Sequence, residues 1–210
     1  MQGFFSDGVK RRRLMMTLLG VITCGVSVGI FKQAAFGVDP FQCLCAGLDR
    51  VIPIPFGTLY MLINLVLLMV VFILDRHYIG IATFINLFLM GYLIDFTQWV
   101  MMQVVPAPSM ALRVVYLIVA IVVMCAGSSL YFTADLGVST YDAIALHLAD
   151  RKLAPFKVIR VATDLICVLA GFAMGYRPGV GTVITAFFMG PLISWFNKVL
   201  AEPMLEGRKA

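Results

Sequence analysis

Six long apolar runs constrain this chain more than any other feature of its sequence. Each has about 18 residues or more and few charges, which is the pattern of a helix that crosses a membrane. At about 1.5 Å of rise per residue, each can span a hydrocarbon core of about 30 Å. The runs cover residues 14–36, 57–74, 81–103, 114–134, 158–175 and 182–201. They predict an all-α integral membrane protein with six transmembrane helices.

The composition agrees with that prediction. Hydrophobic residues make up 61% of the chain and charged residues 13%, against about 45–50% and about 25% in soluble domains. This apolar excess is too large for one soluble core, and the short loops leave no room for a separate soluble domain. The basic segment 1–13 leads directly into the first run with no cleavage site, so we expect a retained helix and not a signal peptide.

The net charge of +5 describes topology and not a nucleic-acid partner, because the basic residues lie at the ends of the runs. With both termini cytoplasmic, twelve basic residues lie inside and three, Arg50, Arg113 and Arg177, outside. This positive-inside bias predicts a multi-pass protein with both termini in the cytoplasm. The twelve are Lys10, Arg11, Arg12, Arg13, Arg76, Arg151, Lys152, Lys157, Arg160, Lys198, Arg208 and Lys209.

Catalytic and metal-binding signatures are missing from the sequence. There is no metalloprotease motif, nucleophile elbow or phosphate-binding lysine loop, so we expect no enzyme, cofactor or metal. A dyad of Ser128 or Ser129 with His147 is the enzymatic arrangement that stays open. Five cysteines lie mostly within the apolar runs, where packing explains them better than redox chemistry does. They are Cys24, Cys43, Cys45, Cys125 and Cys167.

The chain contains an internal repeat. The string FGVDPFQCLCAGL from Phe36 is answered a hundred residues later by LGVSTYDAIALHL, and GIATFINLFLMGYLI from Gly80 by GVGTVITAFFMGPLI from Gly179. Each copy holds three spans, an odd number, so the second copy must enter the membrane from the other side. This predicts two inverted three-helix repeats, an architecture of many secondary transporters. The first repeat covers 14–103 and the second 114–201, with a connecting loop at 104–113 and a cytoplasmic tail at 202–210.

A segment too short to cross the membrane follows the first span of each copy, at 39–49 and 139–150. Asp39 and Ser139 can cap these helices, and Asp142 stands three residues after Ser139. An apolar stripe allows each helix to lie flat at the surface. Alternatively Gly37 and Gly137 permit a tight reversal, and both helices are re-entrant with their N-termini near the midplane. Those N-termini would then bind polar or anionic groups.

Polar residues within the runs complete the candidate site. Asp164 lies near the centre of the fifth run, where a charge costs about 2.5–3.5 kcal/mol, and its repeat counterpart is Asn64. We expect Asp164 to line a cavity and to bind Na⁺ or carry a proton, with buried packing as the alternative. Lys32 can instead reach the interface, and Asp95 interfacial water. The candidate substrate-binding residues are Asp164, Asn64, Asp39, Ser139, Thr140, Asp142, Lys32, Asp95 and Asn86.

The stretch GVDPFQCLCAGLDRVIPIPFGTLYMLINLVLL, followed by GIATFINLFLMGYLIDF, resembles the YczE/YitT-like family of bacterial multipass membrane proteins. The resemblance covers the first three runs well and the last three less well. Family members favour an aromatic-acidic pair after the proline, where this chain has Phe41-Gln42. The resemblance implies a bacterial inner-membrane location and the fold, and it names no substrate. Its motifs are Gly37-x-Asp39-Pro40, Phe56-Gly57-Thr58 and Gly80-x-x-Thr83.

These features favour a secondary transporter or permease for a small polar solute, with anions among the candidates and Na⁺ or H⁺ as coupling ion. The expected partners are the lipid bilayer and that solute, and a homo-oligomer is left open. A passive channel with two half-helices is the first alternative. A membrane accessory protein that supports a partner enzyme is the second. A closed cavity near the midplane would favour the transporter, a continuous water-lined path the channel, and a solid interior the accessory protein.

Overall fold

The computed structural model describes residues 7–206, and every regular element in that range is a helix. The predicted all-α class is therefore confirmed. The predicted segments 1–13 and 202–210 are helical from Asp7 and as far as Glu206, and their remaining residues lie outside the described part of the chain. The elements are α1 (Asp7–Ala34), α2 (Pro40–Val51), α3 (Phe56–Leu74), η1 (Arg76–Tyr78), α4 (Ile81–Val104), α5 (Met110–Ala134), α6 (Thr140–Asp150), α7 (Phe156–Ala173), α8 (Val180–Phe196), η2 (Asn197–Ala201) and α9 (Glu202–Glu206).

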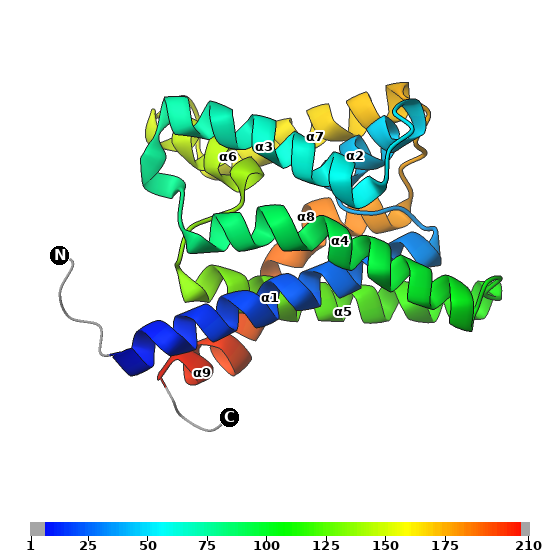
Figure 1. The fold of residues 1–210 in the computed structure, drawn as a ribbon, viewed down its shortest axis with the longest axis horizontal. Coiled ribbons are helices and arrows are strands. Elements are labelled where there is room, and N and C mark those ends of the chain that lie inside the picture. Colours follow the sequence, from blue (N-terminus) through cyan, green and yellow to red (C-terminus); the bar gives the residue numbers. More distant parts are fainter. Residues whose placement is uncertain (1–6, 207–210) are drawn as a thin grey trace.

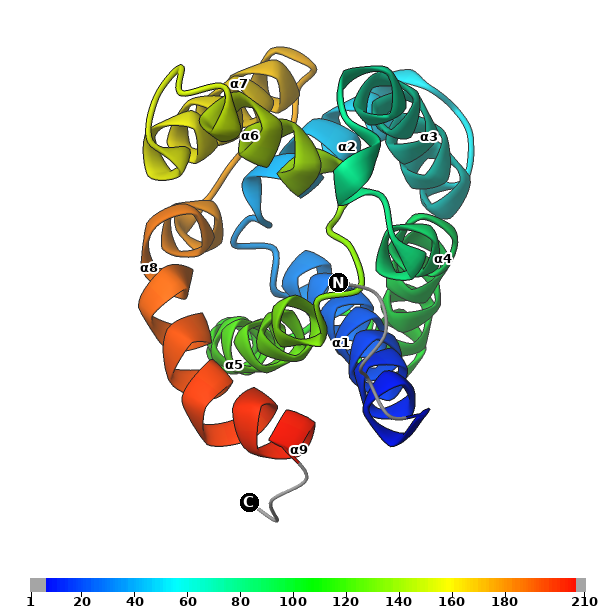
Figure 2. The same ribbon diagram turned by 90° about the vertical axis from the view of Figure 1, so that its left-hand side faces the viewer.

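The long helices run side by side along the longest axis of the molecule, and each reverses the direction of the one before it (Figure 1). These helices are α1, α3, α4, α5, α7 and α8. The start of α1 and the end of α9 lie at the same end of that axis. The helices α1 and α5 pack against each other, and α4 packs along α1. When the molecule is viewed along the axis, α2 lies between α3 and α7 (Figure 2).

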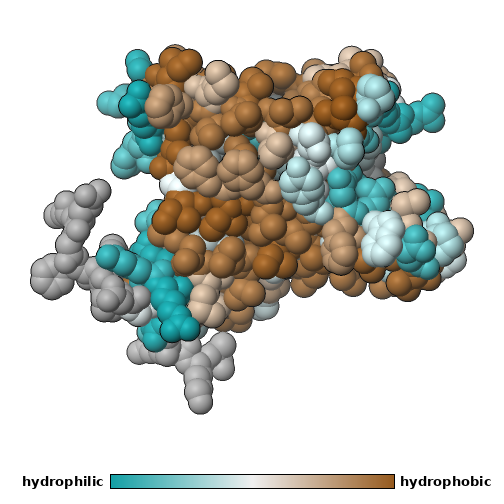
Figure 3. All heavy atoms as spheres, in the orientation of Figure 1, coloured by the Kyte–Doolittle hydropathy of each residue, from teal (hydrophilic) through white to brown (hydrophobic). Residues whose placement is uncertain are grey.

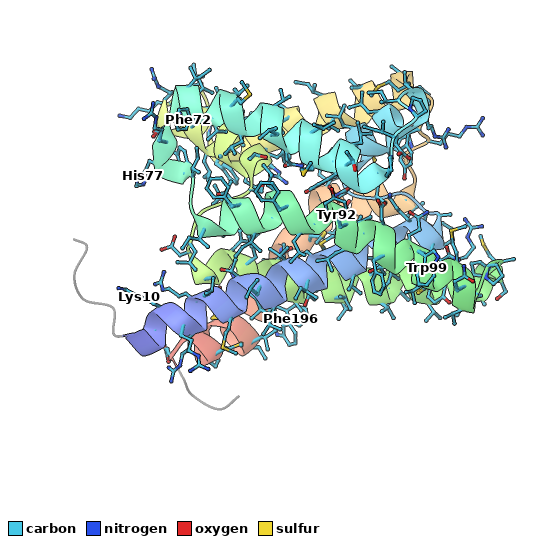
Figure 4. The ribbon with its side chains drawn as sticks, in the orientation of Figure 1. Lys10, Phe72, His77, Tyr92, Trp99 and Phe196 are labelled. Atoms are coloured by element: carbon cyan, nitrogen blue, oxygen red, sulfur yellow. The ribbon has the colours of Figure 1, made fainter. Side chains whose placement is uncertain are left out.

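On the face shown in Figure 3, apolar residues cover the middle of the molecule and hydrophilic residues gather toward its two ends. Exposed aromatic rings lie toward these ends, with Phe72 near one and Trp99 near the other (Figure 4). Within residues 7–206, five helices are long and apolar enough to cross a membrane: α1, α3, α4, α5 and the continuous helix from α8 through α9. A multi-pass location in a lipid bilayer follows.

The remaining predicted run, 158–175, is helical in α7, but its charges keep it out of that group. Lys157, Arg160 and Asp164 all lie in this helix of 18 residues. The composition of α7 therefore differs from that of an ordinary lipid-facing span. In Figure 1 α7 nevertheless runs antiparallel to α3, along the same axis as the other long helices.

Two glycine-containing connections hold the halves together. The chain leaves α1 through Gly37 and α5 through Gly137, with φ of 99° and 112°, a region that favours glycine. The carbonyl of Phe36 accepts a hydrogen bond from the amide of Gly181 at 2.8 Å, and that of Leu136 from Ala82 at 3.0 Å. Each connection therefore docks on the first turn of a long helix in the other half.

The short helices α2 and α6 start inside the molecule. The chain passes from the end of α1 back toward the middle of the long axis, where α2 begins, and α2 then returns to the end that it came from (Figure 1). The path from α5 into α6 is the same at the opposite end. Both short helices contact α3 and α7. Their capped first turns are thus held among the long helices.

Candidate functional site

A cavity of about 380 Å³ lies where the first turns of α2 and α6 meet the long helices. Its walls come from both halves of the chain, from α1 to α4 in the first half and from α5 to α8 in the second. Six of the nine predicted site residues line it: Asp39, Asn64, Asn86, Ser139, Asp142 and Asp164. Among the described residues, no cluster of His, Cys, Asp or Glu could hold a metal ion.

On the first-half wall the polar groups are mostly neutral. Asp39 caps α2 by accepting a hydrogen bond from the amide of Gln42 at 3.2 Å. The side-chain amide of Asn64 donates to the carbonyl of Tyr60 at 2.9 Å, and its oxygen accepts from the Thr140 hydroxyl at 2.7 Å. Thr140 itself is not among the residues that line the cavity. It fixes the orientation of Asn64 from the other half.

The second-half wall carries a partly buried ion-pair network. The guanidinium of Arg160 contacts the carboxylate of Asp142, lies 3.4 Å from that of Asp164, and covers the ring of Tyr141 at 4.6 Å. The Tyr141 hydroxyl donates to Asp164 at 2.6 Å. The Ser139 hydroxyl donates to Asp142 at 2.7 Å and accepts from its amide at 3.1 Å. This pairing is how α7 accommodates its interior charges.

Two cavity-lining atoms are buried with no hydrogen-bond partner among the residues described. They are Oε1 of Gln42, a side chain that is 2% exposed, and the hydroxyl of Tyr131, which is 6% exposed. A buried polar atom without a partner costs about 1–3 kcal/mol. Such atoms are rare in folded proteins and point to a bound molecule that completes them. Neither residue is a predicted site residue.

The lining of the cavity is acidic. Three carboxylates, Asp39, Asp142 and Asp164, line it together with one guanidinium, that of Arg160. The guanidinium already pairs with two of the three. The carboxylate of Asp39 has no ion pair among the described residues. Since like charges repel in a medium of low dielectric constant, the lining favours a neutral or positively charged guest.

Lys32 and Asp95 lie outside the cavity lining. The Lys32 ammonium stands over the ring of Phe56, 3.1 Å from its centroid. The Asp95 carboxylate accepts from the amide of Gly57 at 2.7 Å and so caps α3, which has no side-chain cap of its own at Pro55. The sequence did not predict this capping role of Asp95.

Sequence reasoning missed Arg160, because it counted that residue only as a topological charge. The available signal was spacing: Arg160 precedes Asp164 by four residues and so shares its helix face. The Ser–His dyad that the sequence left open is not assembled. Ser128 Oγ lies 3.7 Å from Cys24 Sγ, Ser129 donates to the carbonyl of Ala126, and His147 lies 3.9 Å from Asp75.

The cavity is closed along one helix seam and open along the equivalent one. A Cβ added to Gly91 of α4 would lie 2.7 Å from the carbonyl oxygen of Gly57, so α3 and α4 are in close backbone contact. Gly190 is the repeat counterpart of Gly91. It lines the cavity, and a Cβ there would meet nothing within 4 Å. In the described part of the chain α7 and α8 make almost no contact, so the cavity opens between them.

Comparison with known proteins identifies the family. The model of the family of unknown function DUF6198 matches residues 11–198. The chain belongs to this family. Curated relatives include an uncharacterized protein of Haemophilus influenzae, 22% identical over 191 residues, which are 91% of this chain and 86% of the relative.

Two further relatives of the chain are proteins of Bacillus subtilis. The uncharacterized protein YyaS is 21% identical over 187 residues, which are 89% of this chain and 93% of the relative. The uncharacterized membrane protein YczE is 22% identical over 174 residues, which are 82% of this chain and 79% of the relative. The predicted YczE-like resemblance is confirmed, and it supports the membrane location. No solved structure matches the chain significantly.

Proposed function

We propose that this DUF6198 chain is a secondary transporter or permease for a small polar solute, built from two inverted three-helix repeats. In this proposal α1, α3 and α4 are the spans of the first repeat, and α5, α7 and α8 those of the second. The antiparallel courses of α1 and α5 support it (Figure 1). So do the exchanged hydrogen bonds of Phe36 and Leu136. The sixth span is α7, whose Arg160 and Asp164 line the cavity.

One observation carries the proposal: the polar cavity between the halves is closed along the α3–α4 seam and open along the α7–α8 seam. A transporter alternates between two states that expose one site to opposite sides of the membrane. In two inverted repeats, equivalent seams would open in turn. A passive pore needs both open together, and an accessory protein needs no polar cavity.

The basic ends of the helices support a cytoplasmic location of both termini. The start of α1, with Lys10, and η1, with Arg76, lie at one end of the molecule (Figure 4). The link between α6 and α7, with Arg151 and Lys152, lies at that same end (Figure 1). By the positive-inside rule this end faces the cytoplasm of a bacterial inner membrane.

The charge of the lining decides which solutes we propose. The anions that the sequence left open would meet three carboxylates and a guanidinium that is already paired. A neutral or cationic solute fits better. For coupling to Na⁺ or H⁺, Asp39 is better placed than Asp164, since Asp164 is held by Arg160 and Tyr141.

Reconstitution into liposomes tests the proposal. A panel of neutral and cationic solutes is applied to the full chain, and charge movement and uptake are recorded. We expect uptake that saturates, and a loss of most of it in Asp164→Asn, which keeps its size but weakens the ion-pair network. The melting temperature in detergent controls for folding. Flux that never saturates with concentration indicates a channel, and wild-type uptake by Asp164→Asn refutes the assigned role.

A further inference from the structure

The first turn of α2 presents acceptors that nothing in the described chain fills. The carboxylate of Asp39 is bonded only by backbone amides of its own turn, those of Gln42 and of Asp39 itself, and has no ion pair among the described residues. Oε1 of Gln42 has no hydrogen-bond partner among the described residues, and the Gln42 residue is only 2% exposed. Both groups line the cavity. Since a side-chain carbonyl and a carboxylate can only accept, the missing partner must donate hydrogen bonds.

The cation of the opposite wall does not supply those donors. The Arg160 guanidinium is committed to Asp142 and Asp164 and stacks over the ring of Tyr141. An anion would have to break this network, and a cation would leave it intact. The negative charge that has no ion pair in the cavity therefore lies on the α2 side, at Asp39.

The remainder of that wall suits a positively charged group on a short apolar chain. The rings of Phe41 and Tyr60 lie edge to face, 5.9 Å apart, and both line the cavity. Aromatic faces attract ammonium and guanidinium groups when their centroids lie within about 6 Å. The side chains of Met90 and Met124 line the same space and offer a flexible apolar surface.

We propose that the cavity binds a small organic cation with N–H donors, a primary ammonium or guanidinium compound, whose charged head lies between Asp39 and Oε1 of Gln42. The Tyr131 hydroxyl, the second unpartnered group, provides a further contact within the cavity. This inference deepens the proposed function and rests on it, since it names the class of solute for the same cavity.

Three probes with short apolar chains of similar length test the head-group chemistry: butylammonium, butyltrimethylammonium and butyrate. Their affinities for the purified full chain in lipid nanodiscs are measured by calorimetric titration. We expect butylammonium to bind at least about tenfold more tightly than butyltrimethylammonium, which has the charge but no N–H donor. Butyrate should not bind. Equal binding of the two cations, or tighter binding of butyrate, overturns the proposal.

Two substitutions locate the head group. Asp39→Asn removes the charge but keeps a side chain that caps helices as well as Asp does. It should weaken butylammonium binding about tenfold or more. The matched control is Asp49→Asn, on the same helix but exposed and outside the lining, and it should bind as the wild type does. If both variants bind as the wild type, the assigned site is wrong.

Gln42→Met separates binding from folding. It replaces an unpartnered buried carbonyl by an apolar chain of similar size, so the melting temperature should stay the same or rise, whereas butylammonium affinity should fall several-fold. A purely structural role would lower the melting temperature and leave the affinity unchanged. The proposed function fails separately: binding of butylammonium without uptake in liposomes contradicts transport, and saturable uptake of other solutes without amine binding contradicts only this inference.

Discussion

The wall of the cavity that α6 and α7 provide is charged, whereas the wall that α2 and α3 provide at the same repeat positions is nearly neutral. Arg160 and Asp164 of α7 correspond to Tyr60 and Asn64 of α3, and Asp142 of α6 corresponds to Gln42 of α2. Only the helix caps reverse this pattern, because the acidic Asp39 caps α2 whereas the neutral Ser139 caps α6. The charged wall is compensated internally by its ion pairs, so its polar groups serve one another. The neutral wall keeps free acceptors and is the better place for a guest.

The two long-helix seams differ in the same way. Gly91 and Gly190 each follow a methionine in the repeat, yet the first lies against backbone and the second against open space. The burial of the helices follows this difference. In the span Ile81–Val104, 44% of the most apolar window is buried, and in Val180–Glu206 only 11%. Equivalent positions of the two repeats thus differ in their surroundings: Gly91 lies in a close helix contact, and Gly190 borders open space.

The largest effect should come from breaking the charged wall. Arg160→Met leaves the buried carboxylate of Asp164 and the half-buried one of Asp142 without their cation. Breaking a fully buried ion pair costs about 3–5 kcal/mol, and the partial exposure of Arg160 places this change at the lower end of that range. We expect a large fall in melting temperature in detergent. The matched change on the neutral wall is Tyr60→Phe. It removes the hydrogen bond between that hydroxyl and the Asn64 side chain but leaves no charge unpaired, so its cost should be smaller, about 1 kcal/mol.

A triple variant sharpens this prediction. Arg160→Met combined with Asp142→Asn and Asp164→Asn removes both signs of charge together and should recover much of the lost stability. If Arg160→Met alone melts as the wild type does, the two carboxylates do not depend on Arg160.

The seams should respond oppositely to the same substitution. Gly91→Leu drives a side chain into the backbone of Gly57, and overpacking costs about 1–3 kcal/mol or more. Gly190→Leu enters open space and improves helix propensity by up to about 1 kcal/mol, so the fold should be retained. The bulk at Gly190 should nevertheless narrow the cavity opening and slow solute uptake.

Melting curves and uptake rates of this glycine pair are compared under the same conditions. A stable Gly91→Leu would mean that the α3–α4 seam is not closely packed. Uptake at the wild-type rate in a folded Gly190→Leu would exclude the α7–α8 seam as the route into the cavity.

Local signals in the sequence predicted the backbone well. The caps at Asp39 and Ser139 and the reversals at Gly37 and Gly137 depend on neighbouring residues only, and the structure has them. Partners that come from distant segments were out of reach. Gly190 is followed by Pro191 and Gly91 by Tyr92, but this local difference does not predict their surroundings, which depend on whether a neighbouring helix approaches. The unpartnered Oε1 of Gln42 also becomes visible only once every surrounding element is in place.

The smallest effect concerns a further difference between the repeats, at Asp95 and its counterpart Ser194. Asp95 accepts from the first-turn amide of α3, whereas the Ser194 hydroxyl only donates back to the carbonyl of Gly190 in its own helix, at 3.0 Å. Asp95→Ala should therefore cost about 1 kcal/mol, as the loss of a helix cap does, and Ser194→Ala should stay within about 0.5 kcal/mol of the wild type. Both variants should bind butylammonium normally, because neither residue lines the cavity. Chemical unfolding and calorimetric titration measure the two quantities separately, and weaker amine binding by Asp95→Ala would place this carboxylate in the binding site after all.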